Sequence, residues 1–416
     1  MSAGPRIISR MPCRSASPPR ASAPRSPAPL PEPLAWLTAA LDGLRTAGLE
    51  RPHRVRAGRQ GREVVLDGRT LLNFGSNDYL GYAGDVRLTK AASKGACGEG
   101  FGAGASPLVS GQSPAHERLE RSIASLLAVE AAVLFSSGFA ANTATIAALV
   151  GPEDFVASDA RNHASIIDGC RLSRAHVGIY PHRDPAALDA MLSAAGSARR
   201  KLVVTDTLFS MDGTLAPLPD LCEVARRHGA IVMVDEAHAT GVLGPRGSGL
   251  VEAAGCAEGV HVRVGTLSKA LGGAGGFVAG NARLVHWLRH RARGWIFSTA
   301  HPPAIAAAAV RAVELLAEEP DRRTALLERA AEFRGRLEAA GLDLGAAGAQ
   351  IVPIVVGRPE AAVAVSDSLA GAGCFVPAIR PPSVPEGRSL VRASLSWHHT
   401  AGDLDRLARA IVTACS

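Results

Sequence analysis

The sequence has few aromatic residues, scattered cysteines and no long apolar run. Phenylalanine, tryptophan and tyrosine make up 4% of its 416 residues. No apolar stretch reaches the roughly 20 residues that a helix needs to cross a bilayer, which argues against a membrane protein. The seven cysteines include no Cys-x-x-Cys pair and no histidines at ligand spacing. They argue against a metal site or a disulfide framework and favour a reducing cytoplasm, with a catalytic cysteine left open as an alternative.

The positive charge of the chain is concentrated at its beginning. Of the formal net charge of +7, residues 1–33 contribute +4, from five arginines and one glutamate. The rest of the chain is nearly balanced, so a nucleic-acid partner is not implied. The same segment holds nine of the 27 prolines and six serines, which predicts a disordered tail. A transit peptide and a wrongly assigned start codon are the alternatives for it.

Beyond the tail, the hydrophobic pattern predicts an α/β protein. A helix over 34–47 and two short strands form an expected N-terminal arm, 34–80. Val- and Ile-rich runs then alternate with helical segments, which predicts a mostly parallel sheet with helices on both faces. We expect a large domain at 81–303 and a smaller C-terminal α/β domain at 304–416, opening with one helical stretch that reaches about residue 340. The expected strands are residues 63–66, 71–74, 132–135, 155–157, 202–205, 231–234, 260–264, 276–278, 351–356 and 390–395.

Two of these strands are followed by an acid and a lysine. Asp235 follows strand 231–234, and Lys269 follows strand 260–264 and precedes a glycine cluster. Ligands in α/β sheets bind at the carboxyl ends of strands. A lysine amine can condense with the aldehyde of pyridoxal 5'-phosphate (PLP), and a carboxylate can keep its pyridine nitrogen protonated. The pair predicts a PLP site, whereas a surface lysine and a helix-capping aspartate are the ordinary alternatives.

Other residues would also suit a PLP site, and each has an ordinary structural role as its alternative. Gly138 lies in a run that opens a helix, whose free amides would receive a phosphate. His163 at a helix start would stack on a cofactor ring, and His238 would bond its phenolic oxygen, although each is otherwise a capping or buried histidine. Ser210 lies where a strand leads into a turn. Arg380, on a proline-stiffened loop, would grip a carboxylate.

Three runs of the sequence resemble the signatures of a known enzyme family. They are residues 73–81 (NFGSNDYLG), 137–142 (SGFAAN) and 235–241 (DEAHATG). Together they resemble the α-oxoamine synthases, a PLP-dependent group of fold type I (aspartate aminotransferase-like), over the chain from about residue 34 to its end. The resemblance implies a large PLP-binding domain, a smaller C-terminal domain and a homodimer with the active site at the subunit interface.

By position, the resemblance implies a role for each matching side chain. Lys269 would hold the cofactor aldehyde, Asp235 the pyridine nitrogen, and His163 would stack on the ring; with His238 these are the expected catalytic residues. The other cofactor-binding residues would be Gly138, Phe139, Ser210, Thr266, Ser298 and Thr299, the last two reaching the neighbouring subunit's phosphate. The substrate-binding residues would be Arg51, Asn77, His163, Arg380 and Ser383.

The run at 379–385 (IRPPSVP) is typical of the branch of this family that acts in biotin synthesis. Resemblance to that branch implies condensation of L-alanine with pimeloyl-CoA or pimeloyl-ACP and loss of CO2. Ser383 stands where threonine is usual, which keeps a hydroxyl, and residues 105–108 depart from the family pattern in a loop that could shape the acyl pocket. The alternatives are another α-oxoamine synthase such as glycine C-acetyltransferase, a PLP aminotransferase, and a non-catalytic binding protein.

Overall fold

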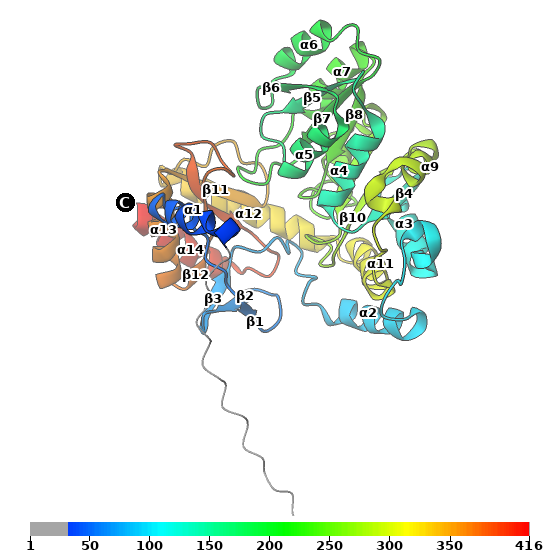
Figure 1. Ribbon diagram of the computed structural model, residues 1–416. Coiled ribbons are helices and arrows are strands. Elements are labelled where there is room, and N and C mark those ends of the chain that lie inside the picture. The colour runs from blue at the N-terminus through cyan, green and yellow to red at the C-terminus, as the bar shows by residue number, and fades with distance from the viewer. Residues whose placement is uncertain (1–31, 416) are drawn as a thin grey trace, which may run out of the picture. The chain divides into compact units, whose positions relative to one another are not determined.

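The computed structural model describes residues 32–415 (Figure 1). The chain forms two compact units, Met1–Glu50 and Arg51–Ser416. The described part of the first unit consists of a 3-10 turn, η1 (Glu32–Leu34), and helix α1 (Trp36–Thr46), which confirms the helix expected at 34–47. The predicted disordered tail lies outside the described residues except for its last two.

The second unit contains a seven-stranded sheet with the strand order β4-β10-β9-β8-β7-β5-β6. Its strands are β4 (Ala131–Phe135), β5 (Phe155–Asp159), β6 (His176–Tyr180), β7 (Lys201–Asp206), β8 (Ile231–Asp235), β9 (Val262–Thr266) and β10 (Gly276–Gly280). Strand β10 runs antiparallel to both of its neighbours, and the other strands run parallel to one another. Every strand expected between residues 132 and 278 is present, and β6 is an edge strand that the sequence did not predict.

Helices cover both faces of this sheet. They are α2 (Val86–Glu99), α3 (Pro114–Leu127), α4 (Gly138–Leu149), α5 (Ala164–Ser173), α6 (Pro185–Ala194), α7 (Leu218–Arg227), α8 (Leu250–Ala253), α9 (Ala282–Arg291) and α10 (Arg293–Ile296), with short turns η2 (Pro107–Gly111) and η3 (Ala257–Gly259). Leu202 and Val204 of β7 belong to an apolar cluster with residues of α4 and α5, whereas Val203 belongs to a cluster with residues of α6 and α7. Figure 1 shows the two helix pairs on opposite sides of β7 and β8. The expected α/β fold class is confirmed.

Residues 303–415 add further helices and a three-stranded antiparallel sheet, β11-β14-β13. These elements are α11 (Pro303–Glu318), α12 (Asp321–Ala339), β11 (Ile351–Gly357), α13 (Pro359–Gly371), β13 (Ala378–Ile379), β14 (Ser389–Ser394) and α14 (Ala401–Cys415). The single helical stretch expected to run to about residue 340 is wrong. Pro320 separates α11 from α12, because proline has no backbone N–H to continue the helix.

A four-stranded sheet connects the beginning of the second unit to its end. Its strands are β1 (Arg56–Ala57), β2 (Glu63–Leu66), β3 (Arg69–Asn73) and β12 (Cys374–Phe375). Strand β12 pairs with β3 in parallel, so a segment near the C-terminus completes a sheet begun near residue 56. The domain boundaries near residues 80 and 303 stay predictions.

The helices of the described residues are too short to span a membrane or carry charged side chains. Within residues 32–415, none combines the length and the apolar character needed to cross a membrane. The longest, α12, has 19 residues and carries charged side chains over most of its length.

Candidate active site

Five parallel strands of the large sheet end at one edge, and each places a candidate site residue there. Gly138 follows β4, His163 follows β5, Asp206 ends β7, Asp235 ends β8, and Thr266 ends β9. The strand interiors are buried and mostly apolar, which fixes the strand ends relative to one another. This is the edge at which α/β sheets bind ligands. Four of the sequence-predicted residues, Gly138, His163, Asp235 and Thr266, therefore lie with Asp206 at one edge although they are far apart along the chain.

Lys269 lies three residues beyond the end of β9, close to two carboxylates. Burial lowers the pKa of Lys269 to about 8, against the opposing attraction of Asp235 and Asp206. The two aspartates are register partners across the β7–β8 pair. Burial and repulsion by Asp235 raise the pKa of Asp206 well above its usual range, which favours the protonated form of that acid. A lysine with a lowered pKa is a nucleophile near neutral pH.

The carboxylate of Asp235 is held by two hydrogen bonds. Asn142 Nδ2, on α4, donates to Asp235 Oδ2 at 2.6 Å, and the backbone N–H of Ala237 donates to Oδ1 at 2.7 Å. The same Asn142 amide donates to Ser165 Oγ at 2.9 Å, and Ser165 Oγ lies 2.8 Å from Nδ1 of His163. Each carboxylate oxygen keeps a lone pair for a further donor. These two hydrogen bonds therefore orient the carboxylate of Asp235, which can still accept further hydrogen bonds.

The two predicted histidines differ in their surroundings. His163 is solvent-accessible and caps α5, and partial burial lowers its pKa. His238 is buried, and burial with the nearby charge of Lys269 lowers its pKa well below the usual value. Tyr79 Oη lies 2.6 Å from His238 Nδ1 and 3.2 Å from Asn77 Oδ1. We assign the tyrosine proton to the shorter contact, which leaves Nε2 of His238 as a donor.

The start of α4 has the form of a phosphate site. Ser137 Oγ accepts from the N–H of Ala140 at 3.0 Å, whereas within residues 32–415 the amides of Gly138 and Phe139 have no backbone acceptor. A Cβ added at Gly276 would lie 2.5 Å from the Gly138 nitrogen, so only glycine allows this approach. Free amides at a helix start attract an anion. Thr266 is buried nearby, and its hydroxyl donates to Gly275 O at 2.7 Å.

Arg392, on β14, is a residue of this site that the sequence did not reveal. It is buried, and burial lowers its pKa. Nη1 donates to the carbonyl of Ser210 at 2.7 Å, and Nη2 donates to Asn77 Oδ1 at 3.2 Å. Its buried Nε has no hydrogen-bond partner among the described residues. The available signal was an arginine inside an otherwise apolar strand, just as Asp206 is an acid that ends a strand in the manner of Asp235.

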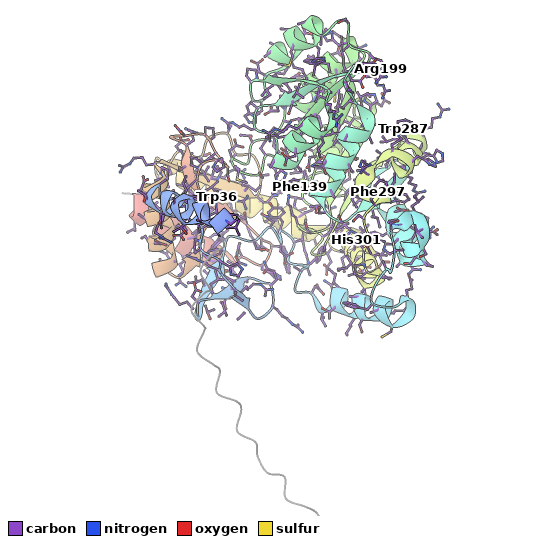
Figure 2. All side chains as sticks on the ribbon, in the orientation of Figure 1. Trp36, Phe139, Arg199, Trp287, Phe297 and His301 are labelled. Carbon is purple, nitrogen blue, oxygen red and sulfur yellow. The ribbon has the colours of Figure 1, made fainter. Side chains whose placement is uncertain are left out.

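Three further predicted cofactor-binding residues are Phe139, Ser298 and Thr299. Ser298 and Thr299 line a small cavity that also includes Ser136, the residue directly after β4. Two phenylalanines close to these residues in the sequence, Phe139 after Ser136 and Phe297 directly before Ser298, have exposed rings and are labelled in Figure 2. The roles predicted for these residues stay predictions.

Three predicted substrate-binding residues are located less centrally. Ser383 is exposed and lines a separate cavity with Phe209. Arg380 is half-buried on the same loop. Arg51 is exposed and is the first residue of the second unit. Their contacts with substrate stay predictions.

Comparison with known proteins agrees with this arrangement. The family described as aminotransferase class I and II matches residues 69–411. The 8-amino-7-oxononanoate synthase of Anaeromyxobacter dehalogenans (strain 2CP-1) is 48% identical over 372 residues, which cover 89% of this chain and 93% of that protein. The enzyme of the same name from Anaeromyxobacter sp. (strain Fw109-5) is 50% identical over 373 residues, covering 90% and 94%.

Among solved structures, a serine palmitoyltransferase from S. paucimobilis with a bound PLP–myriocin aldimine is similar to most of the chain. Its TM-score is 0.87 at 30% identity, and the match covers 92% of this chain and 97% of that one. The resemblance inferred from the motifs therefore extends to the whole fold. The chain belongs to the aminotransferase class I and II family and, within it, to the α-oxoamine synthases.

Proposed function

We propose that this protein is a PLP-dependent acyltransferase that condenses L-alanine with pimeloyl-CoA or pimeloyl-ACP and releases CO2, giving 8-amino-7-oxononanoate. The observation that carries the proposal is Lys269, whose amine has a pKa lowered to about 8, beside a fixed acid on the neighbouring strand. The product is the one named by relatives that are 48–50% identical over nine-tenths of the chain.

The residues at the carboxyl edge fit PLP. Lys269 would carry the aldehyde, Asp235 would accept from the pyridine N–H, and the amides at the start of α4 would hold the phosphate. The Thr266 hydroxyl would turn from Gly275 O to join them. When bound, PLP supplies an electron sink that stabilises negative charge at the α-carbon of the amino acid. His238 would donate from Nε2 to the phenolic oxygen, since Tyr79 occupies its Nδ1. The face of the ring would meet the accessible imidazole of His163.

The amino acid carboxylate would be bound by Arg392 together with Asn77. Arg392 has a donor, Nε, that is buried and unpaired among the described residues. A buried donor without an acceptor costs free energy, and a carboxylate is the natural group to satisfy it. Arg380 was expected to have this role from the sequence. The contacts of Arg392 with Ser210 and Asn77 support Arg392 for the carboxylate and leave Arg380 for a more outward contact.

Lys269 would also move the α-proton. Once the amino group of alanine has displaced it, the neutral amine is a base held close to the α-carbon. The neutral imidazole of His163, whose Nδ1 accepts from the N–H of Ser165, would donate from Nε2 to the thioester carbonyl and polarise it. Overall, the α-carbon of alanine bonds to the acyl carbon, the thiol and CO2 leave, and a proton returns to the α-carbon. Protonated Asp206 would leave Asp235 as the single anion facing the cofactor.

Two further features belong to the proposal. A homodimer is supported by the exposed phenyl rings of Phe139 (46%) and Phe297 (70%) beside the expected phosphate-binding residues. A cytoplasmic location is supported by the scattered, unpaired cysteines of the described chain.

A matrix of acyl donors and amino acids tests the reaction. Purified protein with PLP is assayed with pimeloyl-CoA, acetyl-CoA or no donor against L-alanine, glycine and L-serine, with detection of free thiol. We expect thiol release to be fastest with pimeloyl-CoA and alanine. Preference for acetyl-CoA and glycine would indicate a glycine C-acetyltransferase. Formation of a keto acid without thiol release would indicate an aminotransferase.

A further inference from the structure

A cavity of about 330 Å³ lies beside the proposed active site. Its walls come from the same loops that carry site residues. Asn162, which lines it, directly precedes His163, and Phe209 and Met211, which also line it, flank Ser210. Residues 382–385, the loop containing Ser383, also line the cavity. A substrate that contacts His163 and Ser210 can therefore extend into this cavity.

The lining of this cavity is suited to a ligand that has an apolar hydrocarbon chain with a charged group at its end. Phe209, Met211, Leu344, Val355 and Leu390 contribute apolar surface. The charged members are Arg161, Asp212 and Arg388. Apolar walls bind methylene groups, and guanidinium groups bind carboxylates in a two-pronged geometry.

Arg161 is positioned for such a contact. Its Nη1 donates to Asp212 Oδ2, and Asp212 is itself held by the hydroxyl of Thr214 at 2.8 Å and the N–H of Thr214 at 3.3 Å. The backbone N–H of Arg161 donates to Asp159 Oδ1 at 2.8 Å. Within residues 32–415, Nε and Nη2 of Arg161 make no hydrogen bond. The guanidinium group of Arg161 is therefore held in place through Nη1, while its Nε and Nη2 donors stay available to a ligand.

The proposed product indicates what the cavity would receive. In 8-amino-7-oxononanoate, carbons 8 and 9 come from alanine, so carbons 1–7 come from the acyl donor. The donor consequently has a carboxylate at the end distant from its thioester. That carboxylate is a charged group at the end of an apolar chain, and it needs a cationic partner wherever it is removed from water.

We propose that this cavity holds the acyl chain of the donor and that Arg161, assisted by Arg388, binds its distal carboxylate. The inference rests on the proposed function and deepens it, because it identifies the residues that select a dicarboxylic donor. Asp212 is the positioning residue of this contact, since it acts through Arg161. Arg388 contributes less, because its contact with Asp343 is 3.5 Å long and both side chains are half exposed.

The test compares pimeloyl-CoA with heptanoyl-CoA, which has the same length and no distal carboxylate. Both are assayed with L-alanine on the PLP-loaded wild type, on Arg161→Met and on Arg161→Lys. The control is Arg171→Met, which removes an exposed arginine from α5. Heptanoyl-CoA is measured by turnover or, where it is not turned over, as a competitive inhibitor. The visible cofactor band and the melting temperature verify that each variant is folded.

We expect Arg161→Met to lower kcat/KM for pimeloyl-CoA by about 10- to 100-fold, the value of a lost charge-assisted pair. Heptanoyl-CoA and the Arg171→Met control should be unchanged, and Arg161→Lys should recover part of the loss. An equal loss with both donors would overturn the inference, because Arg161 would then contact the CoA portion. No loss with either donor would overturn it as well. Failure of the proposed function is distinct: wild-type protein would not turn over pimeloyl-CoA at all.

Discussion

Replacing Arg392 with methionine should impair binding of the amino acid far more than replacing Arg380. Arg392 is buried at the carboxyl edge, and its unpaired Nε faces no acceptor among the described residues. A two-pronged pair with a carboxylate consists of two charge-assisted hydrogen bonds, together about 3–4 kcal/mol. Since about 1.4 kcal/mol corresponds to a factor of ten, kcat/KM for alanine should fall about 10²- to 10³-fold in Arg392→Met.

The assay measures kcat/KM for L-alanine at saturating pimeloyl-CoA in wild type, Arg392→Met, Arg392→Lys and Arg380→Met. Arg392→Met also loses the hydrogen bonds to Ser210 and Asn77, which costs about 1–3 kcal/mol of stability. The melting temperature and the cofactor band therefore accompany each rate. Arg392→Lys should recover little, because an ammonium cannot span the three acceptors. A larger loss in Arg380→Met than in Arg392→Met would refute the reasoning.

Further outcomes follow from the same site. Lys269→Ala should abolish both the visible cofactor band and turnover, whereas Lys90→Ala, at an exposed position, should change neither. The rate at which apo-protein captures PLP should rise with pH through about 8 and then level off, because the neutral amine of Lys269 forms as its lowered pKa is passed; a midpoint near the usual lysine value would contradict the assigned burial. Asp235→Asn should bind PLP but lower kcat about 10²- to 10³-fold, the cost of one lost electrostatic partner, and kcat within tenfold of wild type would argue against a contact with the ring nitrogen. Phe297→Glu should shift the protein toward monomer in sedimentation and reduce activity, and an unchanged dimer would remove this ring from the proposed interface.

The strands and their polar ends were predictable from the sequence, because both are local signals. Buried parallel strands need short apolar runs; Asp235 ends one of them, and Lys269 lies three residues beyond the end of another. Strand β6 was missed for the opposite reason. It lies at the edge of the sheet, only Tyr180 in it is buried, and its sequence has no apolar run.

Arg392 and Asp206 were not predicted because their roles depend on contacts between distant segments. Ser210 and Arg392 are 182 residues apart in the chain and meet only in the folded protein. Asp206 becomes unusual because β7 pairs with β8 and places it opposite Asp235. No periodicity or spacing encodes such a pairing, whereas the break at Pro320 was a local signal that the long helical pattern obscured.

The separation between sheet interior and strand ends has an evolutionary consequence. Apolar positions within the strands maintain the architecture, whereas the residues proposed to contact the substrates lie on the loops beyond the strand ends. A loop can exchange Arg161 or Met211 for other side chains at little cost in folding, since neither belongs to the buried apolar core. Substitutions in these loops can consequently change the acyl group that the fold accepts to a longer, shorter or charged one. A serine palmitoyltransferase that is 30% identical to this chain retains the fold at a TM-score of 0.87.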